Sequence, residues 1–249
     1  MDALVQDLDL DGGDLAGEPV TLFGVKPQLY YEELLAQSLF SYTQLSLLAL
    51  QWRVQAMSPV QKVQIWKTFI GARKFRRDRL GRAAEFGYPF LFQIEGDFGI
   101  YRDLERHRML TQERQLLTPY LGHDMPQEIV DAGFDQDVLR AFEPVYSCYE
   151  AVRSVCGEWV AQYAVPFGFK LRWAMGMNLR EAQHMLELRT IPQGHPSYRK
   201  ICQEMARQII QRDPWAADVL GYVDYNEYLW TRDTVEGGIE RKLKALTKE

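Results

Sequence analysis

Two separate stretches of the sequence concentrate arginine and histidine side chains. They contain Arg106, His107 and Arg108 in the first stretch, and Asn178, Arg180, His184, Arg189 and His195 in the second. Guanidinium groups match the oxygen geometry of a phosphate, and a neutral imidazole both donates and accepts hydrogen bonds. Brought into one cleft, the two stretches would bind a phosphorylated ligand. On an open surface they would be ordinary solvated charges, and spacing alone leaves both interpretations open.

The second stretch has the spacing of a helix with two polar stripes. At about 100° per residue, Arg180 and His184 lie about 40° apart, and Asn178 and Arg189 lie about 20° apart three turns along. A surface helix normally buries one stripe and exposes the other. Two functional stripes would suit a helix placed between a ligand and a neighbouring subunit. In the alternative, these charges are solvated and Glu181 pairs with a helix neighbour.

Other chemistries leave fewer signs. The sequence contains no G-x-G-x-x-G after a strand, no phosphate-binding P-loop, no H-E-x-x-H and no G-x-S-x-G. His107, His184 and His195 lack acidic partners at ligand spacing, so we expect no metal site. The three cysteines include no C-x-x-C pair, and we expect reduced, buried thiols.

The elements that must position these residues mix strands with helices. We expect strands at about 20–25 and 88–94, with a bend or second strand from Phe98. We expect helices at about 30–57, from the Ser58-Pro59 cap and from about Arg102. Two further helices are expected at 137–164, with a break near Pro144, and at 197–212. Residues 118–137 must include a loop, and 191–194 should form a turn. This order predicts a mixed α/β or α+β domain.

A basic run follows the helix that should start at Pro59. It consists of Arg73, Lys74, Arg76, Arg77, Arg79 and Arg82. One interpretation is a patch that faces a phosphate. The other, which the segment alone favours, is a solvated helix end whose cations suit the C-terminal dipole.

The composition is that of an ordinary globular chain with an acidic beginning. Of the 249 residues, 47% are hydrophobic and 25% are charged, and the net charge is −5. Residues 1–19 hold six acidic and no basic groups, which leaves 29 basic against 28 acidic groups in the remainder. This nearly neutral body argues against a general nucleic-acid binder. We predict an acidic flexible tail at 1–19, a single domain at 20–230 and a charged tail at 231–249. The sequence shows no membrane span or signal peptide, so we expect a cytoplasmic protein.

Together, the two stretches resemble the flavin-dependent thymidylate synthases of the ThyX family. That family carries an R-H-R-x7-S core followed by R-Y, and a second signature in which a proline precedes an asparagine and two arginines at fixed spacing. The second signature is reproduced without a gap by Pro166, Asn178, Arg180 and Arg189, and the first half of the core by Arg106-His107-Arg108. His195 is similar to the family's histidine beyond the second signature. The resemblance covers roughly residues 20–215.

The resemblance implies a ThyX-like α/β (α+β) fold with a central mixed sheet, long helices and active sites at the subunit junctions of a homotetramer. It implies FAD reduced by NADPH, with a one-carbon unit passing from methylenetetrahydrofolate to C5 of dUMP to give dTMP. The implied flavin-binding residues are Arg106, His107, Arg108, Asn178, Arg180, His184 and His195. Arg106 would also contact the nucleotide. Arg189 would hold dUMP against the flavin and stabilise charge on the uracil carbonyl.

Three positions depart from the family pattern where the dUMP phosphate would bind. Leu116 replaces a serine, while Thr118 and Gln162 replace arginines. A lost charged hydrogen bond costs about 1.5–3 kcal/mol, and Arg114 or the basic run could compensate for the missing cations. Three functions therefore stay open: dUMP methylation, a ThyX-fold flavoprotein that binds another nucleotide or serves as a non-catalytic subunit, and a binding module that uses the basic run on nucleic acid.

Overall fold

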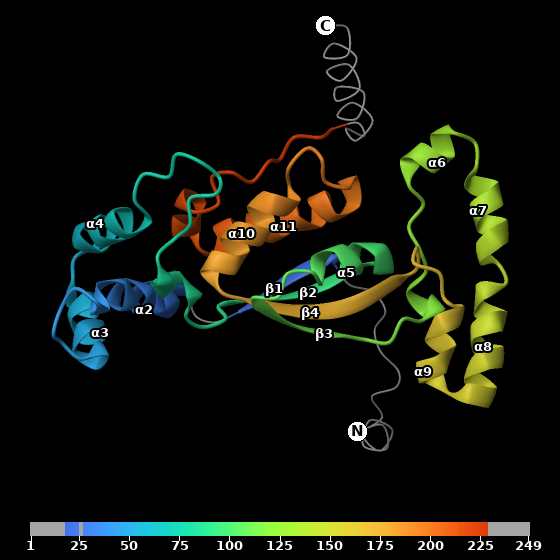
Figure 1. The fold of residues 1–249 in the computed structure, drawn as a ribbon, viewed down its shortest axis with the longest axis horizontal. Helices are drawn as coiled ribbons and strands as arrows, with labels where there is room; N and C mark the ends of the chain where they lie inside the picture. Colours follow the sequence, from blue (N-terminus) through green and yellow to red (C-terminus); the bar gives the residue numbers. More distant parts are fainter. Residues whose placement is uncertain (1–17, 25–26, 229–249) are drawn as a thin grey trace, which may run out of the picture. The chain divides into compact units, whose positions relative to one another are not determined.

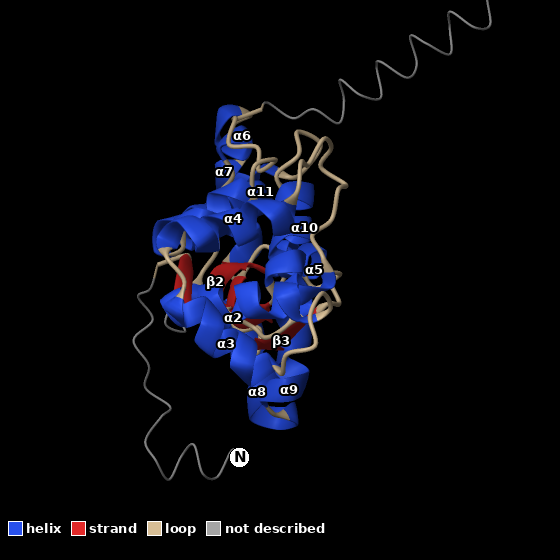
Figure 2. Ribbon diagram, turned by 90° about the vertical axis from the view of Figure 1, so that its left-hand side faces the viewer, coloured by secondary structure: helices blue, strands red, loops and turns tan. Residues whose placement is uncertain are grey.

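The computed structural model describes residues 18–24 and 27–228 (Figure 1). Helix predominates over strand among these residues (Figure 2). The described chain divides into a larger unit, residues 20–24, 27–93, 103–113 and 174–228, and a smaller unit, residues 18–19, 94–102 and 114–173. Residues 1–17 and 229–249, which include most of both predicted tails, lie outside the described residues. The single domain at 20–230 stays a prediction.

Four strands form one sheet. They are β1 (Val20–Gly24), β2 (Phe90–Asp97), β3 (Leu110–Arg114) and β4 (Lys170–Met177). The strands pair in the order β1-β2-β4-β3 and run antiparallel, so the sheet lacks the mixed directions that we expected. Along β2, Phe90, Phe92 and Ile94 are buried while Leu91 is exposed, which is the two-residue period of a strand with one buried face.

The larger unit contains most of the long helices. They are α2 (Pro27–Phe40), α3 (Leu47–Ala56), α4 (Pro59–Ile70), α10 (Leu179–Arg189) and α11 (Pro196–Arg212), with short 3-10 turns at Arg82–Glu85 and Pro214–Asp218. The single helix expected at 30–57 is two helices, because Ser46 caps α3 by accepting the N–H of Ala49 at 3.2 Å. The cap predicted at Ser58 is confirmed, with Gln61 completing a capping box.

The smaller unit contains four helices in the chain segment before β4. They are α6 (Gln127–Asp131), α7 (Asp135–Phe142), α8 (Val145–Cys156) and α9 (Glu158–Ala161), with 3-10 turns at Pro119–Leu121 and Gln162–Ala164. The break predicted near Pro144 is confirmed. A second break falls at Gly157, whose φ of 81° favours glycine.

Around the first arginine stretch, the strand alternative at Phe98 is wrong, and the helix expected from about Arg102 begins earlier. Phe98 begins a helix, α5 (Phe98–Leu104), rather than a strand, because the Asp97 carboxylate accepts the N–H of Ile100 at 2.8 Å. Helical structure then ends at Leu104, and the polar segment Leu110–Arg114 forms β3.

From Arg73 to Arg79 the basic run is a loop, and Arg82 begins the 3-10 turn Arg82–Glu85, so its interpretation as a helix end is wrong. Helix α4 ends at Ile70, and Gly71 leaves it with a φ of 61°. Downstream, α10 and α11 run side by side (Figure 1), and α11 also packs against β1. In the described part of the chain, no helix combines the length and apolar character needed to cross a bilayer.

Candidate functional site

The turn between β4 and α10 places the second signature. Asn178 caps α10, since its Oδ1 accepts the N–H of Glu181 at 2.9 Å. Its Nδ2 donates to the carbonyl of Glu85 at 3.2 Å, and the guanidinium of Arg180 pairs with the Glu85 carboxylate. The segment Arg82–Glu85 is thereby fixed against the start of α10.

A cavity of about 640 Å³ opens beside α10 in the larger unit, and we refer to it as the large cavity. Three of the predicted flavin-binding residues line it, namely Asn178, Arg180 and His184. Arginines of the basic run line the same cavity: Arg76, Arg77 and Arg79. The loop after α4 and the start of α10 thus line one cavity.

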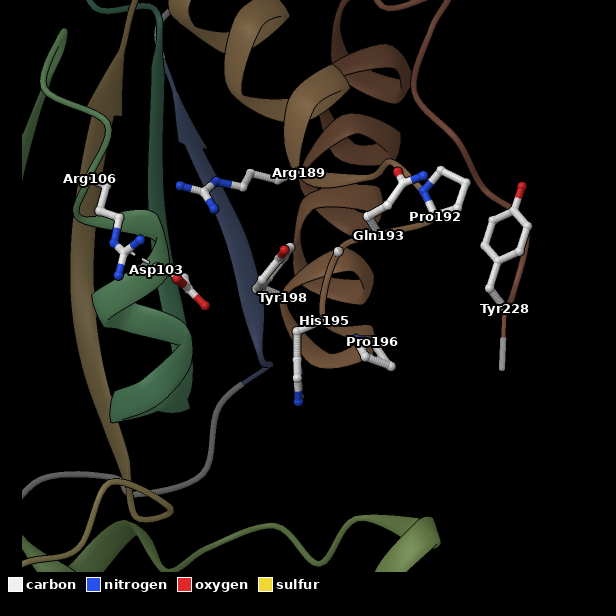
Figure 3. Close-up of a pocket in the computed structure, with 10 residues that line it drawn as sticks. Asp103, Arg106, Arg189, Pro192, Gln193, His195, Pro196, Tyr198 and Tyr228 are labelled. Carbon is white, nitrogen blue, oxygen red and sulfur yellow. Dashed lines mark ion pairs between the residues drawn. The ribbon is translucent and has the colours of Figure 1, made fainter. Parts of the chain in front are cut away.

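A second cavity, of about 230 Å³, lies where α10 ends and α11 begins, and we refer to it as the small cavity (Figure 3). It is lined by Arg106, Arg189 and His195 together with Asp103, Tyr198 and Tyr228. Arg106 forms an ion pair with Asp103 at 3.9 Å, and its side chain is 68% exposed. Arg189 reaches into the cavity from the end of α10 (Figure 3).

The turn between the two helices is tightly packed against this cavity. A Cβ on Gly194 would lie 2.9 Å from the Tyr198 ring and 3.0 Å from the carbonyl oxygen of Arg189. Only glycine fits there without displacing these groups. His195 caps α11, as its Nδ1 accepts the N–H of Ser197 at 3.3 Å. The predicted turn at 191–194 is thus confirmed and leads directly into the helix cap.

Arg106 and Asn178 line different cavities of the chain. We expected the two stretches to converge on one ligand, and within one chain these two residues do not share a cavity. Their convergence between neighbouring chains of an assembly stays a prediction. The two stripes expected on α10 do face separate cavities, with Arg180 and His184 on one and Arg189 on the other. Asn178 joins Arg180 rather than Arg189 because its backbone is extended, with ψ of 171°, so the helical period does not reach it.

His107 connects the residues of the two cavities. Its ring is buried, and Arg189 donates its Nε–H to Nε2 of His107 at 2.9 Å. A guanidinium has no acceptor, so Nε2 must accept and the ring proton sits on Nδ1. Nδ1 then donates to the carboxylate of Glu181 at 2.7 Å. In this chain His107 thus orients two neighbouring side chains from a buried position.

His184 and Arg108 are more accessible to solvent than the buried His107, and the ring of His184 is partly covered. The His184 ring lies 5.6 Å from that of His107. Partial burial lowers the pKa of His184 from its usual 6.5, and His107, Arg79 and Arg76 act in the same direction while Glu181 opposes them. The imidazole of His184 is therefore predominantly neutral at pH 7. Arg108 is not among the residues that line either cavity.

The positions that depart from the family pattern lie in the smaller unit. Gln162 accepts two hydrogen bonds through Oε1, from Nη1 of Arg114 and from the N–H of Leu117, each at 3.0 Å. Arg114 also donates to the carbonyl of Gln115 at 3.0 Å. Arg114 is thus engaged with Gln162 and Gln115, and Leu116 and Thr118 bring no charge.

Neither a metal site nor a disulfide is present among the described residues. Within that part of the chain, no three His, Cys, Asp or Glu side chains are grouped so as to hold a metal ion. All three cysteines are free thiols. Cys202 is buried as expected, whereas Cys148 and Cys156, both in α8, are exposed, contrary to expectation.

Two acidic residues of the site were missed by sequence reasoning. Glu85 pairs with a residue 95 positions away, and Glu181 bonds to one 74 positions away. Local spacing suggested a helix neighbour for Glu181, and no local pattern could have identified either true partner. The basic run was evident in the sequence. Only the cavity distinguishes Arg76, Arg77 and Arg79 from ordinary surface arginines.

Comparisons with known proteins are consistent across sequence and fold. A family model described as thymidylate synthase complementing protein matches residues 73–215. A UPF0159 protein of Chlamydia muridarum (strain MoPn / Nigg) is 37% identical over 206 residues, covering 83% of this chain and 38% of the relative. The UPF0159 protein Ta1429 of Thermoplasma acidophilum is 31% identical over 194 residues, covering 78% and 38%. The chain thus spans less than two fifths of the length of these curated relatives.

A solved structure shares the fold. The crystal structure of a UMP/dUMP methylase PolB from Streptomyces cacaoi bound with 5-Br dUMP superposes with a TM-score of 0.56, over 82% of this chain and 96% of that chain, at 14% identity. This likeness confirms the predicted mixed class of α and β elements in a ThyX-like fold. Since the family model spans more than half of the 249 residues, the chain belongs to the thymidylate synthase complementing protein family, the ThyX family predicted from its two signatures.

Proposed function

We propose that the chain is a flavin-dependent thymidylate synthase-like enzyme that converts dUMP to dTMP with FAD, NADPH and methylenetetrahydrofolate. One observation carries the proposal: the hydrogen-bonded path from Glu181 through His107 to Arg189. The path joins a cavity lined by residues expected to bind flavin to one lined by arginines expected to bind the nucleotide. Family membership and the fold shared with a UMP/dUMP methylase support the same reaction class.

The large cavity suits an anionic dinucleotide such as FAD. Its volume of about 640 Å³ is within the range of small-molecule sites. Asn178, Arg180 and His184 supply amide, guanidinium and imidazole groups along one wall. When bound, the reduced flavin would supply the hydride that completes the methyl group. These side chains would orient the ring system and balance the charge of its phosphates.

Arg189 would act on the pyrimidine. Its Nε is held by His107, and its terminal nitrogens have no hydrogen-bond partner among the described residues. Those nitrogens are free to donate to a uracil carbonyl. Because the guanidinium is already oriented, it can stabilise negative charge that develops on that oxygen without reorganising. His107 serves as a positioning residue in this scheme.

Self-association as a homotetramer is part of the proposal. Arg106 and Arg108 are exposed, so both are accessible to a second copy of the chain. Light scattering coupled to gel filtration measures the mass in solution directly. A strictly monomeric chain that still turns over would refute the shared active site.

One observation favours a second candidate, a ThyX-fold flavoprotein without dUMP methylation. The side chain of Gln162, where the family has an arginine, is committed to Arg114 and to the Leu117 N–H. No cation is offered by Leu116 or Thr118 either. A chain with this change would keep its flavin and bind another nucleotide, or serve as a non-catalytic subunit.

A flavin titration followed by a dUMP titration on the same sample separates the candidates. A yellow protein whose flavin spectrum responds to dUMP, and which releases tritium from C5-labelled dUMP with methylenetetrahydrofolate and NADPH, supports the synthase. Flavin binding without a dUMP response or tritium release supports the second candidate. A colourless protein that cannot be reconstituted with FAD contradicts both and leaves the binding module.

A further inference from the structure

Three arginines that line the large cavity have no side-chain partner in the part of the chain that the structure describes. Arg76, Arg77 and Arg79 lie in the loop after α4. Among the described residues, none of the three side chains forms a hydrogen bond or an ion pair. Guanidinium groups that line one cavity raise its positive potential and favour an anion there. Their unpaired donors could therefore bind an anionic ligand.

The loop that carries these arginines is held in place by buried contacts. Arg73 forms an ion pair with Glu187 at 2.7 Å, with side-chain exposures of 8% and 1%. It also donates to the carbonyls of Asp78 and Arg76, each at 3.1 Å. Gln183 of α10 donates to the same Asp78 carbonyl at 3.1 Å. Because the loop is already fixed in this way, its unpaired arginines lose little conformational entropy when a ligand binds.

The carboxylates around the cavity are already engaged. Glu85 pairs with Arg180, Glu187 with Arg73, and Glu181 accepts from His107. Asp78 accepts the N–H groups of Lys74 and Phe75 at 2.7 and 2.9 Å, which lowers the pKa of its carboxyl. None of these acids is bonded to the three arginines, so the arginine donors remain available to a ligand.

We propose that Arg76, Arg77 and Arg79 form a clamp for the pyrophosphate group of a nucleotide held in the large cavity. Guanidinium forks pair with phosphate oxygens through two hydrogen bonds each, and consecutive phosphates require several such donors. The identity of the ligand as a flavin dinucleotide rests on the proposed function. The phosphate chemistry rests only on the arginines and the cavity. The lowered pKa of His184, to which Arg79 and Arg76 contribute, agrees with their closeness to the same wall.

A charge-matched pair of variants tests the clamp. The test variant is Arg77→Gln/Arg79→Gln, at two exposed positions that line the cavity. The control is Lys74→Gln/Arg82→Gln, at two exposed positions of the same run that do not. Both remove two positive charges, so a general electrostatic effect would act on both alike. Equal thermal unfolding temperatures would confirm that each variant folds.

Calorimetric titration with inorganic pyrophosphate is the first measurement. We expect the test variant to bind about 100-fold more weakly than the wild type, about tenfold for each arginine, and the control to stay within about threefold. Equal weakening of both variants, or none in the test variant, would overturn the clamp. Tighter arginine-dependent binding of a single-stranded oligonucleotide than of pyrophosphate would also overturn it, in favour of nucleic acid.

A comparison of FAD with riboflavin and dUMP identifies the source of the phosphate. We expect the test variant to lose affinity for FAD while its affinities for riboflavin, which lacks phosphate, and for dUMP, which lacks a pyrophosphate, are unchanged. Loss of dUMP binding with intact FAD binding would overturn the clamp as stated. A wild type that binds pyrophosphate through these arginines but binds no flavin would refute the proposed function and leave the clamp standing. Unchanged FAD binding in the test variant would refute the clamp and leave the proposed function standing.

Discussion

Arg189 donates its Nε–H to Nε2 of His107 at 2.9 Å, although the two residues are 82 positions apart in the chain. This bond fixes the tautomer of the imidazole and directs its Nδ1–H to Glu181. One buried ring thereby holds both a cation of the small cavity and a carboxylate of the large cavity. The orientation of Arg189 depends on a residue that lines the other cavity.

Replacing Glu181 should release this arrangement. In Glu181→Ala, Nδ1 of His107 loses its buried acceptor, so we expect the free energy of unfolding to fall by about 1–3 kcal/mol. In Glu181→Gln an amide oxygen can still accept, and the loss should be smaller. Long-range proton–nitrogen NMR spectra should show the Nδ1–H tautomer in the wild type and in Glu181→Gln, and a mixture in Glu181→Ala. A tautomer unchanged by alanine would contradict the role given to Glu181.

Arg189→Ala should abolish tritium release from dUMP while it preserves flavin absorbance. The loss of an oriented donor to a developing anion lowers kcat by about 10²–10³. Arg207 of α11 is an exposed arginine that lines neither cavity, so Arg207→Ala is a suitable control and should turn over like the wild type. Retained turnover in Arg189→Ala would remove this residue from the mechanism.

Glu187→Ala should be strongly destabilising. The partner Arg73 is buried and would be left without its carboxylate, and breaking a buried ion pair on one side costs about 3–5 kcal/mol. Glu204 pairs with Arg207 on the surface, and Glu204→Ala should cost less than about 1 kcal/mol. Urea unfolding of both variants measures the difference. Similar small losses would mean that the loop after α4 is not held by this pair.

Local signals predicted the elements that rely on neighbouring residues. Ser58 and Pro59 marked the start of α4, and the proline and glycine positions marked the turn before α11. The loop of the basic run carries such a signal too, since glycine, here Gly71, commonly ends a helix, but the charge pattern that continues beyond it favours a helix end. The start of α5 depended on a cap by Asp97, which competed with the strand character of the segment.

The same contrast between local signals and long-range contacts applies to the site residues. Their types and the family signatures identified Asn178, Arg180 and Arg189 from sequence, and the structure gives each a defined position beside α10. The distribution of these residues over two cavities could not be predicted from the sequence. It depends on pairs such as His107 and Glu181, which only the folded chain brings together. The family signatures name residues and not the contacts among them.

The pH dependence of stability should carry a contribution from His184. Burial lowers the pKa of His184 in the folded state below 6.5, with Glu181 opposing and His107, Arg79 and Arg76 reinforcing the shift. Well above pH 6.5, from about one pH unit higher, the ring is neutral in both states and contributes nothing. As the pH falls below that value the unfolded chain takes up the proton first, so the free energy of unfolding decreases until the folded ring also titrates.

The variant His184→Gln lacks the titrating ring, so comparing its stability with that of the wild type isolates the contribution of His184. The stabilities of the wild type and the variant should differ by a constant amount from about one pH unit above 6.5 and change relative to each other only below that, with the wild type losing more. Urea unfolding across a pH series, with an NMR titration of the ring, measures both quantities. A ring that titrates at or above the usual value would contradict the environment described for it.

The cysteines offer a chemical test of how α11 is packed. Burial raises the pKa of Cys202 to about 12, so its thiolate is scarce at neutral pH and the sulfur is out of reach of a reagent. Cys148 and Cys156 are exposed. A disulfide reagent should therefore modify two thiols quickly in the native chain and a third only after unfolding, and Cys202→Ser should abolish the slow phase alone. Three fast thiols would contradict the packing of α11 in the larger unit. Because the slow rate follows opening of that unit, FAD bound in the large cavity should decrease it further.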